Sequence, residues 1–202
     1  MTTPPDFAVS CANLPAQDFS DWMEAAHDAL EPEPTAMALS TLASDGAPRL
    51  RWVLCKGWGE DGLRFFTNLG SEKGRNLAAD ARVAAAFHWG AMHRQVRVEG
   101  AIEPLPATDA DAYYESRPRL SRLGAWASRQ SQPLADRQEL LDSVRAVETR
   151  FQAQSPPRPP HWSGFRIVPH RWEFWQGREG RLHDRRVCQL VGDAWLQWAL
   201  YP

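Results

Sequence analysis

The sequence predicts a mainly β protein with flanking helices, in which the strands form a barrel and the helices pack outside it. Short segments of alternating polarity follow one another with brief turns between them, which is typical of antiparallel pairing. Segments with helical spacing are few and separate these runs of strands. The 202 residues are enough for one domain with a sizeable core and too few for two.

One helix and a meander of strands are expected in the N-terminal part. In residues 18–30 the apolar side chains recur at helical spacing, and Asp18 or Ser20 stands where a cap is needed. Three strands are then expected, over residues 37–43, 49–58 and 63–67.

The middle of the chain mixes both element types. Helices are expected over residues 73–79, 108–115 and 135–152, and strands over residues 83–89 and 94–105. Residues 116–133 are rich in Arg, Ser and Gly, so we expect a loop there.

The C-terminal part predicts further strands behind a stiff connector. Residues 155–160, Ser-Pro-Pro-Arg-Pro-Pro, favour an extended linker, since proline fixes φ and lacks an N–H donor. Strands are expected over residues 164–168, 171–176, 186–191 and 193–200. We expect a single domain over residues 1–202, with any disorder confined to residues 1–17.

Composition is that of a globular protein, with 43% hydrophobic and 24% charged residues, which excludes fibrous and wholly disordered classes. The three cysteines are too few and too scattered for a disulfide framework or a structural zinc site, and they fit a reducing compartment. No window reaches the roughly 18 apolar residues of a membrane span, and no signal peptide is visible at the N-terminus. We therefore expect a cytoplasmic protein with no membrane partner.

Charge is unevenly distributed along the chain. Residues 1–48 contain no Lys or Arg, so all 23 basic residues follow them, and the formal net charge is −2. This local excess suits small anions, whereas nucleic acid usually demands a larger one. We expect no nucleic-acid partner.

Motifs of several enzyme classes are missing. Gly57-Trp-Gly59-Glu-Asp-Gly62 matches the dinucleotide-binding pattern, but a strand follows it and its two acids would repel a pyrophosphate. The sequence lacks G-x-S-x-G, H-E-x-x-H, P-loop and C-x-x-C patterns, so hydrolase, zinc and nucleoside-triphosphate chemistry have no signature, and no metal site is expected.

Cations and hydroxyls gather instead in four segments, 51–56, 66–73, 113–131 and 173–185. In residues 66–73 a strand end, a Gly-Ser turn and a helix start bring Ser71, Lys73 and free N–H groups together, as phosphate binding requires. Each segment taken alone is equally typical of a solvated strand end, a capped helix or a loop. The combination of the four segments favours a site for phosphorylated ligands.

These segments closely resemble the pyridoxamine/pyridoxine 5′-phosphate oxidases, FMN-dependent enzymes that make pyridoxal 5′-phosphate. The resemblance runs from about residue 33 to the C-terminus. It rests on Arg51 with Lys56, Phe66-Thr-Asn-Leu-Gly-Ser71 with Lys73, Arg94-Gln-Val-Arg-Val-Glu-Gly100, Ser116-Arg-Pro-Arg119, Gly124-Ala-Trp126, Gln130-Ser131, Trp162-Ser-Gly-Phe165, and Glu173-Phe-Trp-Gln-Gly177 with Arg181-Leu-His-Asp-Arg185.

The resemblance implies an FMN-binding split β-barrel and a homodimer with FMN at the subunit interface. The cofactor-binding residues that it implies are Arg51, Trp52, Val53, Leu54, Lys56, Phe66, Thr67, Lys73, Gln95, Gln130, Ser131, Trp175 and Arg185. Arg51, Thr67 and Lys73 match the flavin-phosphate contacts. Val53, Leu54, Phe66 and Gln95 match the lining of the flavin ring and ribityl chain, and the second subunit is expected to supply Gln130, Ser131, Trp175 and Arg185.

The resemblance also implies a substrate site. Lys56, Tyr113, Arg117 and Ser121 match a cradle for the substrate phosphate, which suits a dianion because it combines cations with neutral donors. Arg181 and His183 match a catalytic pair that binds the substrate ring. The implied reaction oxidises pyridoxamine or pyridoxine 5′-phosphate with O2 and releases H2O2.

Two departures bear on this expectation. Glu72 stands where many relatives carry a second cation, which predicts weaker FMN binding, and the acidic N-terminus lacks the basic segment that covers the substrate in many relatives. Two alternatives stay open: a flavin oxidase of the same fold that acts on another ring, as in phenazine-type biosynthesis, and a non-catalytic flavin-binding or pyridoxal-phosphate-binding protein.

Overall fold

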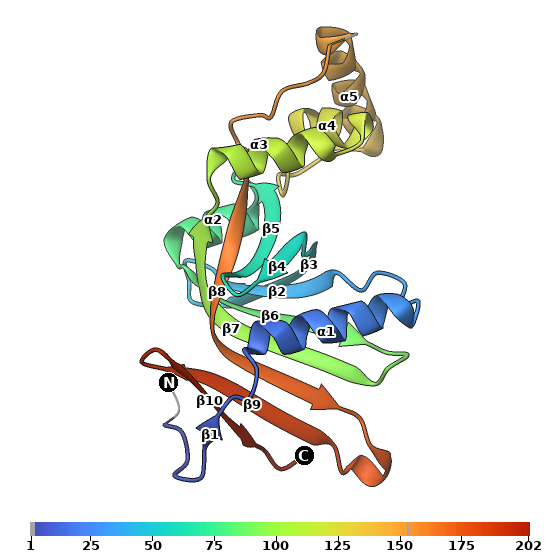
Figure 1. The fold of residues 1–202 in the computed structure, drawn as a ribbon. Coiled ribbons are helices and arrows are strands. Elements are labelled where there is room, and N and C mark those ends of the chain that lie inside the picture. The colour runs from blue at the N-terminus through green and yellow to red at the C-terminus, as the bar shows by residue number, and fades with distance from the viewer. Residues whose placement is uncertain (1–2, 153) are drawn as a thin grey trace.

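Ten strands, all paired antiparallel, form the framework of the computed structural model, which describes residues 3–152 and 154–202 (Figure 1). The strands are β1 (Val9–Ser10), β2 (Ala36–Leu42), β3 (Pro48–Leu54), β4 (Gly57–Gly59), β5 (Gly62–Asn68), β6 (Arg82–Trp89), β7 (Arg94–Pro104), β8 (Trp162–Gln176), β9 (Asp184–Val191) and β10 (Ala194–Ala199). The helices are α1 (Pro15–Asp28), α2 (Glu72–Ala79), α3 (Ala107–Ser116), α4 (Arg119–Ala127), α5 (Arg137–Phe151) and the 3-10 helix η1 (Glu179–Arg181).

The sheet curls on itself without closing. Its hydrogen-bonded order is β1-β10-β9-β8-β7-β6-β2-β3, and β5 pairs with β8 outside this path. Within the described residues no ladder joins β3 to β5, although the two strands approach each other. The prediction of a mainly β, split-barrel fold with flanking helices is therefore confirmed, and the barrel is open along the line between β3 and β5.

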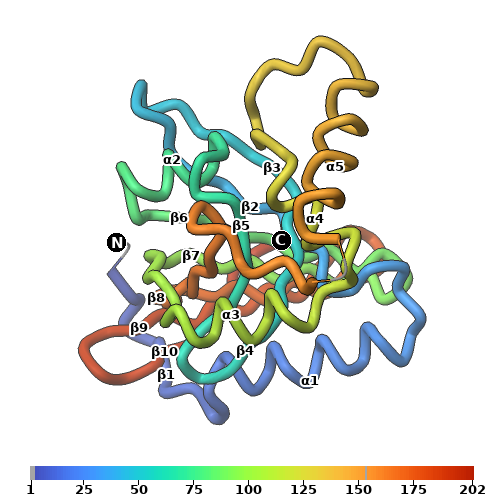
Figure 2. The backbone as a smooth tube through the Cα atoms, turned by 90° about the horizontal axis from the view of Figure 1, so that it is seen from above, coloured from blue at the N-terminus to red at the C-terminus, as the bar shows by residue number. Residues whose placement is uncertain are grey.

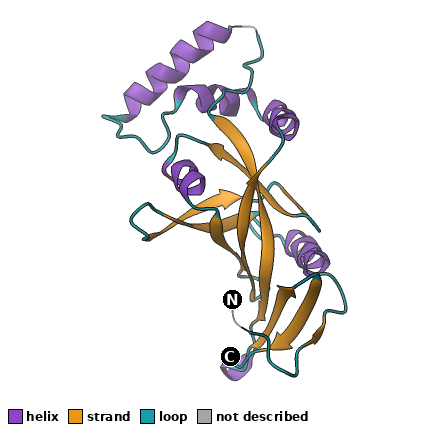
Figure 3. Cartoon of the chain, turned by 90° about the vertical axis from the view of Figure 1, so that its left-hand side faces the viewer, coloured by secondary structure: helices purple, strands orange, loops and turns teal. Residues whose placement is uncertain are grey.

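The helices lie on the flanks and at one end of the sheet (Figure 3). Helix α1 crosses the strands between the barrel and the β9–β10 hairpin, while α3, α4 and α5 gather at the far end of β8 (Figure 1). Seen from above, the connection from α4 to α5 lies beside β3 (Figure 2), where it reaches the same cavity as that strand.

The main core lies between α1 and the barrel strands. Phe19 of α1 is fully buried and its ring contacts Trp58, Phe87, Trp89 and Trp172. Such aromatic packing contributes beyond the area it buries, so this helix is a structural support of the barrel.

Helix α1 begins earlier than expected. Asp18 and Ser20 were predicted as caps, but the helix starts at Pro15, and Leu14 at the N-cap makes no side-chain bond. Proline is pre-organised for the first helical position because its φ is fixed and its missing N–H has no partner there. Asp18 instead forms an ion pair with Arg186 of β9, 2.7 Å away.

Residues 1–17, for which the sequence analysis allowed disorder, include regular secondary structure. Strand β1 pairs with β10, and α1 begins at Pro15. Residues 1 and 2 lie outside the described residues.

Three interior predictions were wrong in detail. The expected strand over residues 49–58 is two strands, β3 and β4, separated at Cys55 and Lys56. The expected loop over residues 116–133 contains α4, since Pro118 precedes a helical turn whose Leu123 is buried. The two strands expected over residues 164–168 and 171–176 form one strand, β8, whose pairing with β7 continues across a bulge: Glu99 faces Arg171 and Gly100 faces Pro169, so His170 is the extra residue.

Candidate functional site

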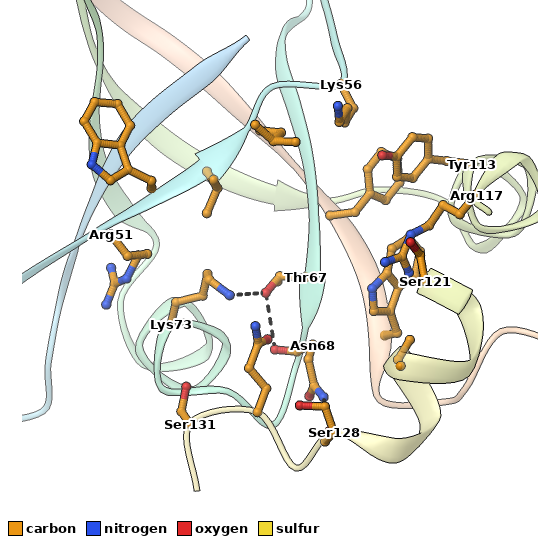
Figure 4. Close-up of a pocket in the computed structure, with 18 of the residues that line it drawn as sticks. Arg51, Lys56, Thr67, Asn68, Lys73, Tyr113, Arg117, Ser121, Ser128 and Ser131 are labelled. Carbon is orange, nitrogen blue, oxygen red and sulfur yellow. Dashed lines mark hydrogen bonds between the residues drawn. The ribbon is translucent and has the colours of Figure 1, made fainter. Parts of the chain in front are cut away.

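A cavity of about 650 Å³ opens where β3 and β5 face each other. Its walls come from β3, β5, the start of α2, α3, α4 and the connection to α5 (Figure 4). Figure 4 shows Arg51 and Lys73 on one side and Tyr113, Arg117 and Ser121 on the other. The gap in the barrel is thus a candidate binding site with cations at two separate places.

The first cationic group is built on β3 and on the start of α2. Arg51 donates from Nη1 to Thr41 Oγ1 at 2.6 Å and to the Arg49 carbonyl at 2.8 Å, which fixes its guanidinium. Lys73 donates from Nζ to Thr67 Oγ1 at 2.5 Å and to Ser71 Oγ at 3.4 Å. Two cations and the Thr67 hydroxyl therefore converge on the cavity, which is the donor set that a phosphate monoester needs.

The turn between β5 and α2 holds Lys73 in this position. Asn68 Oδ1 accepts from the Gly70 amide at 2.8 Å, and Ser71 caps α2 by accepting from the Gly74 amide at 3.1 Å. A Cβ on Gly74 would lie 2.3 Å from the Leu69 carbonyl oxygen, so only glycine allows the turn to fold this closely. The motif Phe66-Thr-Asn-Leu-Gly-Ser71 thus forms a tight turn that places the Lys73 side chain next to Thr67.

Burial and the neighbouring Arg51 lower the pKa of Lys73 to about 8. Both causes disfavour a cation in the free protein. A bound phosphate would oppose both, so this lysine is prepared for an anionic ligand.

The second cationic group lies against a cluster of aromatic rings. The rings of Phe66, Tyr113 and Trp162 have nearly parallel planes, and the Phe66 centroid lies 4.1 Å from that of Tyr113 and 5.4 Å from that of Trp162, which are 6.1 Å from each other. The Arg117 guanidinium lies 5.0 Å from the Trp162 ring centroid, and its Nη1 is buried without a hydrogen-bond partner. A buried, unpartnered guanidinium nitrogen beside a cavity is a place for an anion.

Lys56 and Ser121 line the same cavity as Arg117 and Tyr113. Desolvation raises the pKa of the Tyr113 hydroxyl, which keeps it a neutral donor. Apolar side chains, among them Val53 and Leu54, line the cavity together with these polar groups. The arrangement suits flat aromatic ligands that carry phosphate.

A second cluster lies on β7, β8 and β9. The strand register places Gln95 opposite Trp175 and Trp175 opposite Arg185, so their side chains form one row on one face of the sheet. Arg185 donates from Nε and Nη2 to the buried carboxylate of Glu173, at 2.9 and 2.7 Å.

His183 and Arg181 belong to this second cluster. The His183 ring lies 4.6 Å from the Trp175 ring, and its Nδ1 accepts from the Arg178 amide at 3.1 Å. In neutral His183 the proton therefore sits on Nε2, which is free to donate. Arg181 is exposed and has a φ of 61°, a left-handed conformation that is uncommon for non-glycine residues.

The structure brings most of the predicted residues together, and it separates the rest. The cavity is lined by Arg51, Trp52, Val53, Leu54, Lys56, Phe66, Thr67, Lys73, Tyr113, Arg117, Ser121, Gln130 and Ser131. The residues that do not line it in this chain are Gln95, Trp175, Arg181, His183 and Arg185.

Within one chain, the placement of three residues differs from the expected assignment, which stays a prediction for the dimer. Gln130 and Ser131, expected from the second subunit, line the cavity of their own chain. Gln95, expected beside Val53 and Phe66, lies in the row with Trp175. The connection from α4 to α5 folds back toward β3, which could not be read from its loop-like composition.

Five residues that line the cavity were assigned no role from the sequence: Asn68, Gly124, Ala125, Ser128 and Trp162. Trp162 lies in a segment that carried the resemblance, but nothing in its local pattern indicates that it supports Arg117. Asn68 lines the cavity and donates from Nδ2 to the Ser128 carbonyl at 3.5 Å, which links β5 to the end of α4. A tryptophan and an asparagine occur in many structural contexts, so their role in a site cannot be predicted from sequence without knowledge of their tertiary contacts.

Residues 3–152 and 154–202 contain no group of three or more His, Cys, Asp or Glu side chains arranged to hold a metal ion. None of the helices in this part of the chain combines the length and the apolar character needed to cross a membrane.

Comparison with solved structures defines the class of protein. A pyridoxamine 5′-phosphate oxidase-related, FMN-binding protein from Nostoc punctiforme superposes with a TM-score of 0.77 at 15% identity, covering 95% of this chain and all of that one, which establishes the shared fold. PhzG from Burkholderia lata, solved in complex with tetrahydrophenazine-1-carboxylic acid, superposes with a TM-score of 0.88 at 30% identity, covering 93% of this chain and 92% of that one. The fold is that of the FMN-binding split barrels.

Sequence comparison identifies the family. A family model described as pyridoxamine 5′-phosphate oxidase matches residues 23–151, and one described as the pyridoxine 5′-phosphate oxidase C-terminal dimerisation region matches residues 162–202. The chain belongs to the pyridoxamine 5′-phosphate oxidase family.

Curated relatives match nearly the whole chain. A pyridoxine/pyridoxamine 5′-phosphate oxidase from Synechocystis is 49% identical, covering 95% of this chain and 89% of the relative. One of the same name from Anaeromyxobacter dehalogenans is 51% identical, covering 96% of this chain and 98% of the relative.

Proposed function

We propose that this protein is an FMN-dependent oxidase that converts pyridoxamine or pyridoxine 5′-phosphate to pyridoxal 5′-phosphate, with O2 as electron acceptor and H2O2 as second product. The observation that carries the proposal is a single cavity with two cationic groups and an aromatic wall, because both ligands of this reaction are aromatic phosphates. Relatives of this name, about half identical to the chain, support it.

The cavity residues fit FMN. Arg51, Lys73 and Thr67 would hold its phosphate, because they supply two cations and a hydroxyl in one place. Val53, Leu54 and Phe66 would contact its ring system. When bound, FMN supplies hydride acceptance from the substrate and transfer of the electrons to O2.

The second cationic group would hold the substrate phosphate. Arg117, with its unpartnered Nη1, and Lys56 supply charge, while Tyr113 and Ser121 supply neutral hydroxyls. The nearly parallel rings of Phe66, Tyr113 and Trp162 form a firm wall that excludes water and holds the substrate in one orientation.

The catalytic pair would come from the partner subunit of a homodimer. Arg181 and His183 do not line the cavity of their own chain, and they lie in the region that matches the family's dimerisation model. His183 offers its Nε2 proton to the polar substituents of the substrate, since the Arg178 amide occupies Nδ1. Arg181 would orient the substrate by its fixed positive charge, and Trp175 and Arg185 would contact the flavin from the same side.

Replacement of Arg181 tests the assigned chemistry. Arg181→Ala should lower turnover by roughly 10²-fold or more, because a positioned charge at the reacting group is lost, while the protein keeps its flavin. Turnover is measured as peroxide formation, and bound flavin by its visible absorbance. Near-wild-type turnover with full flavin would exclude Arg181 from catalysis.

A second candidate function is oxidation of another ring system. The likeness to PhzG, whose structure holds a tetrahydrophenazine carboxylic acid, favours it. The cluster of Lys56, Tyr113, Arg117 and Ser121 opposes it, because a ligand without phosphate does not need these residues. Peroxide formation with a reduced phenazine carboxylic acid and none with phosphorylated B6 vitamers would select this candidate, and no peroxide with either would indicate a non-catalytic flavin-binding protein.

A further inference from the structure

One carboxylate, Glu72, lines the cavity beside the cations Arg51 and Lys73. Left alone, this charge would cancel part of the attraction for a phosphate dianion, and the sequence accordingly predicts weaker FMN binding. The structure gives Glu72 a partner: Arg49 Nε lies 3.4 Å from Glu72 Oε1.

Arg49 reaches Glu72 from the strand that carries Arg51. The two arginines are two residues apart on β3, so their side chains leave the same face, and Arg51 Nη1 donates to the Arg49 carbonyl at 2.8 Å. Glu72 and Arg49 also act as opposing influences on Arg51: desolvation lowers the pKa of its guanidinium, the Glu72 charge raises it, and the Arg49 charge lowers it. All three side chains therefore interact electrostatically at one site.

We propose that Arg49 is a positioning residue of the cofactor-phosphate site, which neutralises Glu72 and draws its carboxylate away from the phosphate. This inference rests on the proposed function, since it assumes that FMN phosphate binds at Arg51 and Lys73. Arg49 also pairs with Asp45, whose Oδ2 lies 3.4 Å from Arg49 Nη2. The group of Arg49, Arg51, Lys73, Glu72 and Asp45 therefore carries one net positive charge, and without Arg49 it carries none.

The exposure of the pair sets the size of the effect. The Arg49 and Glu72 side chains are 40% and 49% exposed, so solvent screens their mutual attraction and the pair adds little to folding stability. A dianion bound nearby would still be repelled by an unbalanced Glu72. We expect Arg49→Gln to raise the Kd for FMN about tenfold at low salt.

A double-mutant cycle on the flavin-free protein tests this proposal, with the Kd measured by quenching of flavin fluorescence. Glu72→Gln should bind FMN at least as tightly as the wild type. The Kd of the double variant R49Q/E72Q should return to within about threefold of the wild-type Kd, because the Glu72 charge that Arg49 neutralises is gone. Arg49→Lys should keep the affinity, since it keeps the charge.

Two controls separate the phosphate effect from a change of fold. Riboflavin lacks the phosphate, so its Kd should be the same in R49Q and in the wild type. Arg82, whose ion pair with Asp80 lies outside the cavity, is the matched control, and Arg82→Gln should leave the Kd for FMN unchanged.

The outcomes separate this inference from the proposed function. If wild type binds FMN but R49Q binds it equally well, or if E72Q does not restore R49Q, the role of Arg49 is wrong and the oxidase proposal stands. If the wild type binds riboflavin and FMN with equal affinity, the phosphate site itself is wrong, and both proposals fall.

Discussion

At the scale of single residues, the cavity contains charged groups that lower the stability of the ligand-free protein. Lys73 is desolvated and faces Arg51, and Arg117 Nη1 has no partner. Neither feature helps folding, so both are understood best as preparation for anions. The sequence could identify these residues by their type and motif, because Arg and Lys grouped with hydroxyl residues in short segments carry chemical signal even without coordinates.

The pKa of Lys73 predicts how FMN binding depends on pH. Because its pKa in the free protein is about 8, the lysine is charged below that value and neutral above it. FMN affinity should therefore be nearly constant from about pH 6.5 to 7.5 and should fall above pH 8, by up to about tenfold per pH unit. The Kd is measured by flavin fluorescence titration at each pH.

Lys73→Met supplies the control for this prediction. Its FMN affinity should be lower and independent of pH over the same range, because the titrating ammonium group is gone. Folding stability should depend on pH in the opposite direction to FMN affinity. Because the pKa of Lys73 is lowered from 10.5, its charged form destabilises the flavin-free protein below pH 8, and this destabilisation disappears as pH rises toward 10.5. An FMN affinity that rises above pH 8 would contradict the role of Lys73 in binding phosphate.

At the scale of elements, the strands were predictable and the α4 region was not. Alternating polarity locates β2, β5, β6 and β7 nearly to the residue, since one face of each packs on the core. The two arginines, the serine and the glycine of α4 resemble a loop in composition, and the helix is stabilised by tertiary contacts. Trp126 Nε1 donates to the Pro157 carbonyl at 2.7 Å, and the Trp126 ring packs on Phe151 of α5. Propensity alone does not reveal such a helix.

These contacts predict that Trp126 supports the substrate side of the cavity. Ser121, Gly124 and Ala125 of α4 line the cavity, and Trp126 attaches this helix to residues 155–160. Trp126→Ala should lower the Tm by about 4–8 °C, which corresponds to about 2 kcal/mol of lost packing. It should also raise the KM for the phosphorylated substrate more than the Kd for FMN.

Leu120 is the control on the same helix, because its side chain is 70% exposed. Leu120→Ala should leave both Tm and KM unchanged, since this side chain buries little surface in the chain. A Trp126→Ala protein with wild-type KM would show that α4 does not position the substrate.

At the scale of the whole molecule, we propose that the site is completed by a second chain. Gln95, Trp175, Arg181, His183 and Arg185 were predicted as site residues, and strand register brings three of them into one row, yet none lines the cavity of its own chain. The sequence could not say which subunit supplies each residue, because that depends on the fold of the connection from α4 to α5 and on how two copies meet. The match of residues 162–202 to a dimerisation region supports a shared site.

Mixing two impaired variants tests the shared site, at an FMN concentration that saturates the wild type but not Lys73→Met. Lys73→Met damages the cavity of its own chain, and Arg181→Ala damages the catalytic residue given to the partner. A dimer with one chain of each kind then contains one fully intact site, so an equal mixture, unfolded and refolded together, should regain about a quarter of wild-type activity. Activity is followed as peroxide formation, with each variant refolded alone as control. No recovery in the mixture would mean that the cavity and Arg181 act within one chain.

The central claim is that this chain oxidises a phosphorylated B6 vitamer at a flavin held in the cavity between β3 and β5. The most direct measurement is anaerobic mixing of the FMN-loaded protein with pyridoxamine 5′-phosphate, followed by flavin absorbance, and then admission of air with assays for aldehyde and peroxide. We predict bleaching of the flavin, recovery in air, and formation of both products. A flavin that binds but stays oxidised in the presence of the substrate would contradict the claim.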